Sequence, residues 1–284
     1  MNRKGIFLGL LICATCVVYA KKTNCQFEPK GIQKLVRVAV GGPEDVFGLD
    51  SSGKVHQWDA ETKTWAKRTN EKLDYIAVGP DGFVCGLIEG RVHWLDRELG
   101  WTEFDGDYPK VGSISFSGDG VLWGVTELVE GTGLLRGNRY RRIFKVGSMG
   151  TTGPSREIGD FEYLERWGLF DKVVVLRDKG IWTLNNSNLV LYDGLKKTMF
   201  SRRVSLGSLK DISIGASGNP WGISLDGVPC MWESQTGARS VLKPWIRLSC
   251  APLNGGKFVS IAVASDDVVW LVREDGTVGT LVGK

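Results

Sequence analysis

One short phrase recurs along the chain, and an internal repeat constrains the possible folds more than any single residue does. The phrase is an apolar residue, any residue, a second apolar residue and then glycine or another small residue. At successive intervals of 38, 38, 98 and 49 residues, it begins at Val38, Ile76, Ile114, Ile212 and Ile261. Because 98 is twice 49, a sixth copy is expected near residue 165, where the degraded sequence Leu164–Gly168 stands.

Each copy reads as four short strands separated by turns. In the fifth copy, an alternating strand at Ile212–Ile214 precedes a glycine-rich turn, and the second strand carries Trp221. A third strand with Trp232 and a fourth with Trp245 follow. Four strands in about 40 to 45 residues are typical of a propeller blade. With 38 glycines and 11 tryptophans at repeated turns and strands, the sequence predicts an all-β fold, a six-bladed β-propeller of four-stranded blades.

The two ends of the repeat array complement each other. The sixth copy stops after its third strand, at about Val282, and lacks a fourth. Cys25 precedes Val38 by 13 residues, the same spacing that separates the fourth-strand Trp101 from Ile114. We therefore expect the N-terminal segment to complete the sixth blade and close the ring, which removes exposed strand edges.

The first residues read as a targeting segment. Residues 1–20 combine a basic start, a 13-residue apolar run at Ile6–Val18 and small residues before a cleavage point after Ala20. The run is too short for a membrane-spanning helix. We expect a signal peptide at 1–20, a propeller over 21–284, secretion to the extracellular space and no stable membrane insertion. The net charge of +4 gives no argument for nucleic acid as a partner.

Cysteines and a sequon predict the covalent modifications of a secreted chain. Four cysteines follow the signal peptide, an even number that permits disulfides in an oxidising compartment. Cys25 lies in the segment expected to close the ring and Cys250 in the connection entering the sixth blade, so we expect Cys25–Cys250. Cys230–Cys250 is the alternative, and Cys85 is expected to be a buried thiol. Asn185 begins an N-glycosylation sequon.

The repeats carry a resemblance to a known family. The stretches from Ile114 to Trp123-Gly-Val and from Ile212 to Trp221-Gly-Ile resemble the tectonin repeat, V-x-V-G…V-W-G-V-N. The six-copy secreted arrangement resembles the fish egg lectins and the tectonin-type tachylectin. The resemblance implies a lectin without a cofactor, not an enzyme, that binds N-acetylglucosamine-type or lipopolysaccharide glycans on microbial surfaces in innate immunity.

The resemblance also implies where sugar would bind. The family asparagine after W-G-V is absent from every copy, and its place is taken by Asp50, Ile88, Thr126, Arg177, Ser224 and Arg273. The aligned tryptophan is retained in three copies and replaced in the others by Phe47, Cys85 and Val174. Tryptophan faces pack on sugar rings, although tryptophan repeated on a strand also suits a core between blades. The expected carbohydrate-binding residues are Trp123, Thr126, Trp221, Ser224, Asp50 and Trp270.

A cluster of basic residues follows the second strand of the third copy. Arginine forks bind phosphate and carboxylate groups in a bidentate way, so acidic glycans or lipid A phosphates are expected ligands. The alternative is a solvated strand and loop face. The expected anionic-glycan patch comprises Arg136, Arg139, Arg141, Arg142 and Lys145.

Catalytic and metal-binding patterns are weak in this sequence. Its two histidines, His56 and His93, occupy the same place in adjacent copies, which suits a structural role better than a shared metal or a catalytic triad. A glycosidase pair stays open, because the separation of carboxylates is invisible in sequence. We expect no enzyme and no metal. The alternative function is a secreted protein-interaction or structural propeller whose sugar sites have degenerated.

Overall fold

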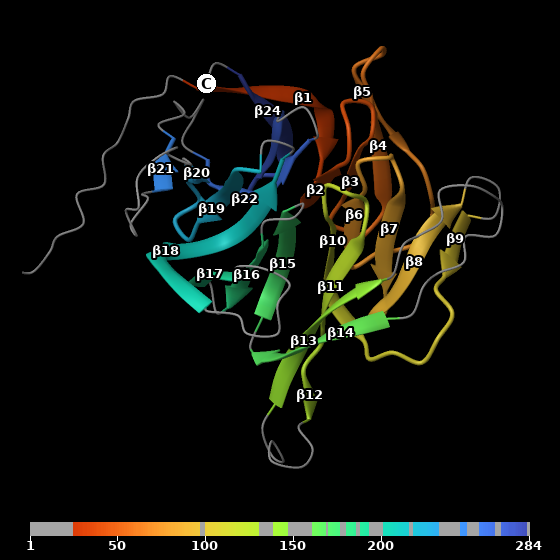
Figure 1. The fold of residues 1–284 in the computed structure, drawn as a ribbon. Helices are drawn as coiled ribbons and strands as arrows, with labels where there is room; N and C mark the ends of the chain where they lie inside the picture. Colours follow the sequence, from red (N-terminus) through yellow and green to blue (C-terminus); the bar gives the residue numbers. More distant parts are fainter. Residues whose placement is uncertain are drawn as a thin grey trace, which may run out of the picture.

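The computed structural model describes most of the chain as a β-propeller (Figure 1). The predicted signal peptide, 1–20, lies outside the described residues. Within the part described, no helix is long and apolar enough to cross a membrane. The described residues are 25–96, 100–130, 139–146, 161–168, 170–176, 180–185, 188–192, 201–215, 218–232, 245–248, 256–264 and 268–282.

The first two sheets each follow chain order from the inside of the ring outward. Each has four antiparallel strands, and the turns between them place Gly53, Gly82, Gly90 and Gly100 at positive φ. The first sheet contains β2 (Arg37–Val40), β3 (Val46–Leu49), β4 (Val55–Asp59) and β5 (Thr64–Lys67). The second contains β6 (Tyr75–Val78), β7 (Val84–Ile88), β8 (Arg91–Asp96) and β9 (Gly100–Glu103).

The third sheet is enlarged by an insertion. Its order is β10–β11–β13–β12, and β14 pairs with the other edge of β13. The degraded phrase Leu164–Gly168 lies in β14, so it is an outer strand of this sheet and not the inner strand of the next copy. The strands are β10 (Val111–Phe116), β11 (Leu122–Thr126), β12 (Val129–Glu130), β13 (Arg139–Val146) and β14 (Phe161–Gly168).

The fourth sheet has seven strands, because one long strand belongs to two repeats. The first half of β18 pairs with β17 and its second half with β19. Five sheets therefore form instead of the six separate four-stranded blades that we predicted. The strands are β15 (Phe170–Leu176), β16 (Gly180–Asn185), β17 (Asn188–Tyr192), β18 (Ser201–Ile214), β19 (Pro220–Ser224), β20 (Pro229–Trp232) and β21 (Trp245–Arg247).

The fifth sheet joins the two ends of the described chain. Its strands β22 (Phe258–Val263), β23 (Val269–Arg273) and β24 (Thr277–Val282) are completed by β1 (Gln26–Lys34), which runs antiparallel to β24. This is the pairing expected for the N-terminal segment, and Figure 1 shows the red strand beside the dark blue one.

The cysteines and the sequon fall partly within the described residues. Cys25 is disulfide-bonded, and Cys250, its predicted partner, lies outside them. Cys85 and Cys230 are buried thiols. The backbone of Asn185 ends β16, whereas residues 186–187 of its sequon lie outside the described part.

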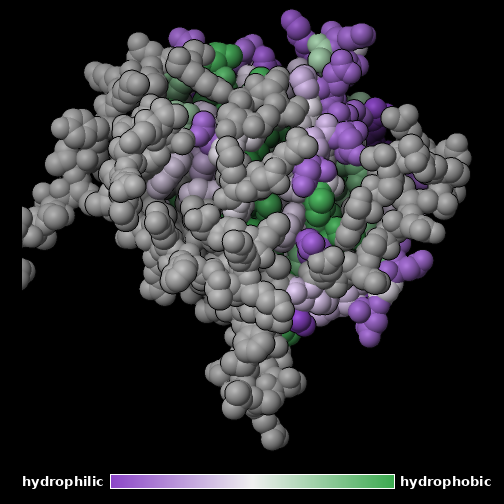
Figure 2. Space-filling model, viewed as in Figure 1, coloured by the Kyte–Doolittle hydropathy of each residue, from purple (hydrophilic) through white to green (hydrophobic). Residues whose placement is uncertain are grey.

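Six strands surround the axis of the molecule. The strands β2, β6, β10, β15, β18 and β22 contact one another in a closed cycle. They line one cavity of about 90 Å³. In Figure 2, hydrophobic side chains are visible near the middle of the same face. The fourth inner strand is β15, so the missing repeat begins at Val173 and not near residue 165.

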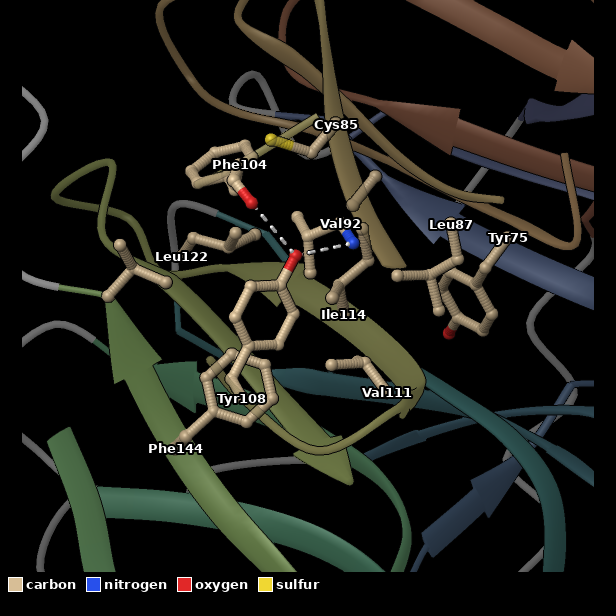
Figure 3. Close-up of a cluster of buried hydrophobic side chains, with 12 residues drawn as sticks. Tyr75, Cys85, Leu87, Val92, Phe104, Tyr108, Val111, Ile114, Leu122 and Phe144 are labelled. Carbon is tan, nitrogen blue, oxygen red and sulfur yellow. Dashed lines mark hydrogen bonds between the residues drawn. The ribbon is translucent and has the colours of Figure 1, made fainter. Parts of the chain in front are cut away.

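Apolar clusters fill the spaces between neighbouring sheets. Figure 3 shows the cluster between the second and third sheets, where Phe104, Phe144 and Leu122 are fully buried. The hydroxyl of Tyr108 stays satisfied in this cluster, because it accepts a hydrogen bond from the Val92 amide at 3.1 Å and donates one to the Phe104 carbonyl at 3.4 Å. Burial of such side chains stabilises each sheet-to-sheet contact.

Candidate functional site

The tryptophans predicted to stack on sugars lie in the protein core. Trp123, Trp221 and Trp270 are 4%, 3% and 5% exposed. Each belongs to an apolar cluster formed with the next sheet, and Trp270 also packs against Trp58 with ring centroids 6.0 Å apart. A sugar needs an exposed ring face, so the prediction for these three residues is wrong. Trp182 occupies the same register in the fourth repeat and is equally buried.

Asp50, which was predicted to bond to sugar hydroxyls, accepts hydrogen bonds from residues of its own turn. Its carboxylate accepts hydrogen bonds from the Ser52 amide at 2.8 Å and the Lys54 amide at 3.0 Å, and His56 Nε2 lies 3.0 Å away. Burial raises the pKa of Asp50, but hydrogen bonds from Ser52, His56 and Lys54 together hold the pKa far below its usual range. Three hydrogen bonds saturate Oδ1 and His56 occupies Oδ2, so the carboxylate holds its own turn together.

Ser224 is likewise part of a turn. Its hydroxyl donates to the Asp226 carboxylate and accepts from the Val228 amide at 3.0 Å. Asp226 also forms an ion pair with Arg247, and the hydrogen bonds from Ser224 and Arg247 lower the pKa of Asp226. The prediction that Ser224 binds sugar is therefore not supported by its contacts, which stabilise the β19–β20 turn.

A groove beside the third sheet gathers two of the predicted residues, Thr126 and Arg141. Its volume is about 370 Å³, which lies within the range of small-molecule sites. We call it the β10–β15 groove, and it is lined by Gly112, Val125, Thr126, Glu127, Leu128, Arg141 and Asp171.

Two β-bulges shape this groove. The register of the β10–β11 pair shifts between Val111 and Ser113, and that of the β15–β16 pair shifts between Phe170 and Lys172. Bulges redirect side chains out of the regular alternation. Gly112 and Asp171 are the residues at these two shifts, and both line the groove. Gly112 leaves space there, whereas Asp171 places an exposed carboxylate in it.

Arg141 connects the two sides of the groove. Its Nη1 donates to the Phe170 carbonyl at 2.7 Å and to Asp171 Oδ1 at 2.9 Å, which links β13 to β15. Among the described residues, its buried Nε has no hydrogen-bond partner. The guanidinium therefore brings a positive charge to the groove, whereas its buried Nε is out of reach of a ligand there.

The remaining lining is mixed in character. Thr126 is fully buried, and its hydroxyl accepts a hydrogen bond from the Arg142 amide at 2.9 Å, so this predicted residue shapes the wall and its burial keeps the hydroxyl from a ligand. Glu127 is exposed, and the side chain of Leu128 is an exposed apolar surface. The groove thus combines carboxylates, a guanidinium and an apolar face.

Arg141 and Arg142 of the predicted basic patch have different partners and lie on opposite faces of β13. Arg141 binds Asp171, while Arg142 lies over the ring of Tyr163, 4.1 Å from its centroid. The backbone of Arg139 lies in β13, and Lys145 lies four residues beyond Arg141 in the same strand. Arg136 lies outside the described residues. Adjacent side chains of a strand point to opposite faces, so Arg141 and Arg142 cannot serve one ligand.

Sequence reasoning missed Gly112, Glu127, Leu128 and Asp171. The extra residue of a bulge shifts the apolar alternation by one position, but in a short strand the alternation does not show which residue is displaced, and nothing else distinguishes Asp171 from a turn aspartate. Across the described ranges, there is no cluster of three or more histidine, cysteine or carboxylate side chains that could hold a metal ion.

Solved structures similar to this chain are propellers of low sequence identity. A gluconolactonase from Xanthomonas campestris gives a TM-score of 0.60 at 10% identity, covering 93% of this chain and 87% of that one. A streptogramin B lyase gives 0.59 at 14% identity, with 92% and 98% covered. The WD40 propeller domain of Doa1 gives 0.54 at 12% identity, with 93% and 96% covered. No family model and no curated protein matches the chain.

These findings show the propeller fold and correct two predictions. The tectonin assignment is wrong, because the similar structures are gluconolactonase, lyase and WD40 propellers. The repeated phrase describes a buried strand before a tight turn, which propeller blades need whatever their family. The prediction that the chain is not an enzyme, drawn from its weak catalytic patterns as well as from the resemblance, is contradicted by similar structures that are named as a gluconolactonase and a lyase.

Proposed function

We propose that the chain binds a small carbohydrate-derived ligand in the β10–β15 groove. The observation that carries the proposal is the lining, where Arg141, Asp171 and Glu127 stand beside the apolar side chain of Leu128. A sugar ring has the matching features, since its hydroxyls bond to charged groups and its C–H faces pack on apolar side chains. The volume of about 370 Å³ is large enough for one sugar ring and small enough to orient it.

The charges of the groove favour sugars that carry an acid or lactone group. The Arg141 guanidinium lines the groove, and its positive charge favours a carboxylate or carbonyl oxygen there. One similar structure is named as a gluconolactonase, which makes sugar lactones and sugar acids the first ligands to test. The Asp171 and Glu127 carboxylates are the groups that a hydrolytic step in this groove would use as a general base.

The sequence suggests where the protein would meet this ligand. Residues 1–20 have the pattern of a signal peptide, so we propose that the protein acts outside the cell. Glycans of microbial surfaces are then an accessible source of the ligand.

We also propose that the ring consists of six repeat units, with two of them joined in the seven-stranded fourth sheet. The cycle of six inner strands and the division of β18 between two partners support this count. The groove then lies between the third and fourth units. No other unit has an insertion comparable to residues 127–138 after its second strand, so one site of this kind is expected per chain.

Blocking the groove tests the proposal. A Cβ on Gly112 would lie 3.8 Å from the nearest backbone oxygens, so Gly112→Leu fills the groove without a clash at the backbone. Gly256→Leu is the matched control, since its Cβ would meet Arg273 at an ordinary 3.6 Å. Ligand-observed NMR with N-acetylglucosamine, gluconate and glucono-lactone should show binding to the wild type and the control, and none to Gly112→Leu.

A second variant tests the role of the charged groups in the groove. Asp171→Asn should weaken binding and remove any lactone hydrolysis that the NMR time course reveals, because the carboxylate is lost while the shape is kept. The proposal is refuted if the wild type binds none of the three probes, or if Gly112→Leu binds them as well as Gly256→Leu does.

A further inference from the structure

A polar layer crosses the axis of the propeller at one level. The residue before each apolar inner-strand phrase occupies the same register in all six repeats, as in the pairs Ser113–Val125, Asp211–Ile223 and Ser260–Val272. These residues surround the axis together, and the residue that follows each of them on its inner strand is valine or isoleucine. The axial polar layer consists of Arg37, Tyr75, Ser113, Lys172, Asp211 and Ser260.

One half of this layer ties successive inner strands together. Lys172 Nζ lies 2.6 Å from Asp211 Oδ1, which links β15 to β18. The Ile261 amide donates to Asp211 Oδ2 at 3.0 Å, which links β18 to β22. The Val38 amide donates to Ser260 Oγ at 3.4 Å, which links β22 to β2. The Asp211 carboxylate is buried and uses both oxygens, so it has little capacity for another cation.

The other half of the layer has unused donors. The Arg37 guanidinium lies over the ring of Tyr75, 3.9 Å from its centroid, and among the described residues no carboxylate pairs with it. Tyr75 is 8% exposed, and its hydroxyl has no hydrogen-bond partner in the described part of the chain. A buried hydroxyl without a partner is costly and marks a place where a further group belongs.

The layer carries an excess of positive charge. Arg37 and Lys172 contribute two cations, and Asp211 contributes one carboxylate. Burial, the largest single effect, lowers the pKa of Lys172, but the Asp211 carboxylate and Tyr75 raise it, and the net shift is upward, so the ammonium stays charged. An uncompensated buried charge attracts a counterion.

The cavity at this layer limits the size of that counterion. Arg37, Tyr75 and Lys172 all line the axial cavity, whose volume of about 90 Å³ equals that of about three water molecules. A sugar ring or a nucleotide does not fit in this space, whereas a halide or a formate ion does.

We propose that the axial polar layer binds one small monovalent anion, held by the Arg37 guanidinium, the Lys172 ammonium and the Tyr75 hydroxyl. The anion neutralises the charge excess and satisfies the buried hydroxyl, so it joins the inner strands on the side of the ring that Asp211 and Ser260 do not reach. This site is separate from the groove and does not depend on the ligand proposed there.

Chloride binding tests the proposal directly. Broadening of the chloride-35 NMR line by the purified protein reports binding, and the melting temperature should rise when sodium chloride replaces sodium gluconate at equal ionic strength, since gluconate is too large for the cavity. Arg37→Gln should abolish both effects. Arg68→Gln is the matched control, because Arg68 is exposed and bonds to Gln57 away from the axis.

Tyr75→Phe separates binding from folding. It keeps the ring beneath Arg37 and removes only the unpartnered hydroxyl, so in gluconate the variant should melt at or above the wild-type temperature. Its chloride affinity should fall about tenfold, the usual effect of one hydrogen bond to a charged group. Equal chloride broadening in wild type and Tyr75→Phe, or an absence of broadening in the wild type, overturns the proposal.

Discussion

Replacing Trp221 by alanine distinguishes a core residue from a sugar platform. The side chain is 3% exposed and packs against Ile261 and Leu271 of the next sheet in one apolar cluster. An aromatic side chain buries about 150–250 Å², and at about 25 cal/mol per Å² its removal costs about 4–6 kcal/mol. Measured losses for such truncations are about 3–5 kcal/mol. We therefore expect Trp221→Ala to lose about 4 kcal/mol.

The loss is measurable as a lower melting temperature or an earlier urea midpoint. In a domain of this size, about 4 kcal/mol corresponds to roughly 8–16 °C. Trp101→Ala is a suitable control: Trp101 is partly exposed and donates through Nε1 to the Thr69 hydroxyl at 3.2 Å, so its loss should be smaller. Ligand binding in the groove should persist in folded Trp221→Ala. A variant that keeps wild-type stability but loses sugar binding would refute the assignment of Trp221 to the core.

Three further predictions follow from the packing and the charges. Asp211→Ala leaves Lys172 buried without its carboxylate and should cost about 3–5 kcal/mol in urea denaturation; a cost below about 1 kcal/mol would contradict the axial ion pair. The folded-state pKa of Asp50 is lowered, so its contribution to the free energy of unfolding is complete at neutral pH and is progressively lost as the pH falls below about 3.8. The difference in unfolding free energy between wild type and Asp50→Asn should therefore narrow between pH 7 and pH 3. A constant difference would contradict this. Gly124→Ala would place a Cβ 2.3 Å from the Phe144 ring and should cost about 1–3 kcal/mol in thermal melts, whereas Gly112→Ala, with 3.8 Å to its nearest neighbour, should be near neutral.

The repeat predicted the propeller and most of its inner strands from five phrases. It failed in the fourth repeat because the insertion after Thr126 broke the spacing, and because β14 has an apolar pattern of its own. The inner strand there, Phe170–Leu176, carries Lys172, whose charge is tolerated beside Asp211. That pairing joins residues 39 positions apart along the chain, which local periodicity does not reveal.

The candidate site was less predictable than the fold. A tryptophan that fills the space between sheets has the same sequence context as one that faces solvent, so the burial of Trp123, Trp221 and Trp270 needed the three-dimensional arrangement. Thr126 and Arg141 were identified and do line the groove. Their neighbour Asp171 depends on a bulge, which periodicity does not show.

The pairing of β1 with β24 has a consequence for how the molecule is made. Lys34 Nζ donates to Thr277 Oγ1 at 3.0 Å across 243 residues of sequence. On the ribosome, β1 therefore emerges long before its partner exists, and its hydrogen-bonding edge stays unpaired through synthesis of the intervening sheets. Contacts so distant in sequence form late and slow folding. Assembly of the propeller is thus a post-translational event, and a ribosome stalled before β24 would hold a chain whose first strand is still open to other partners.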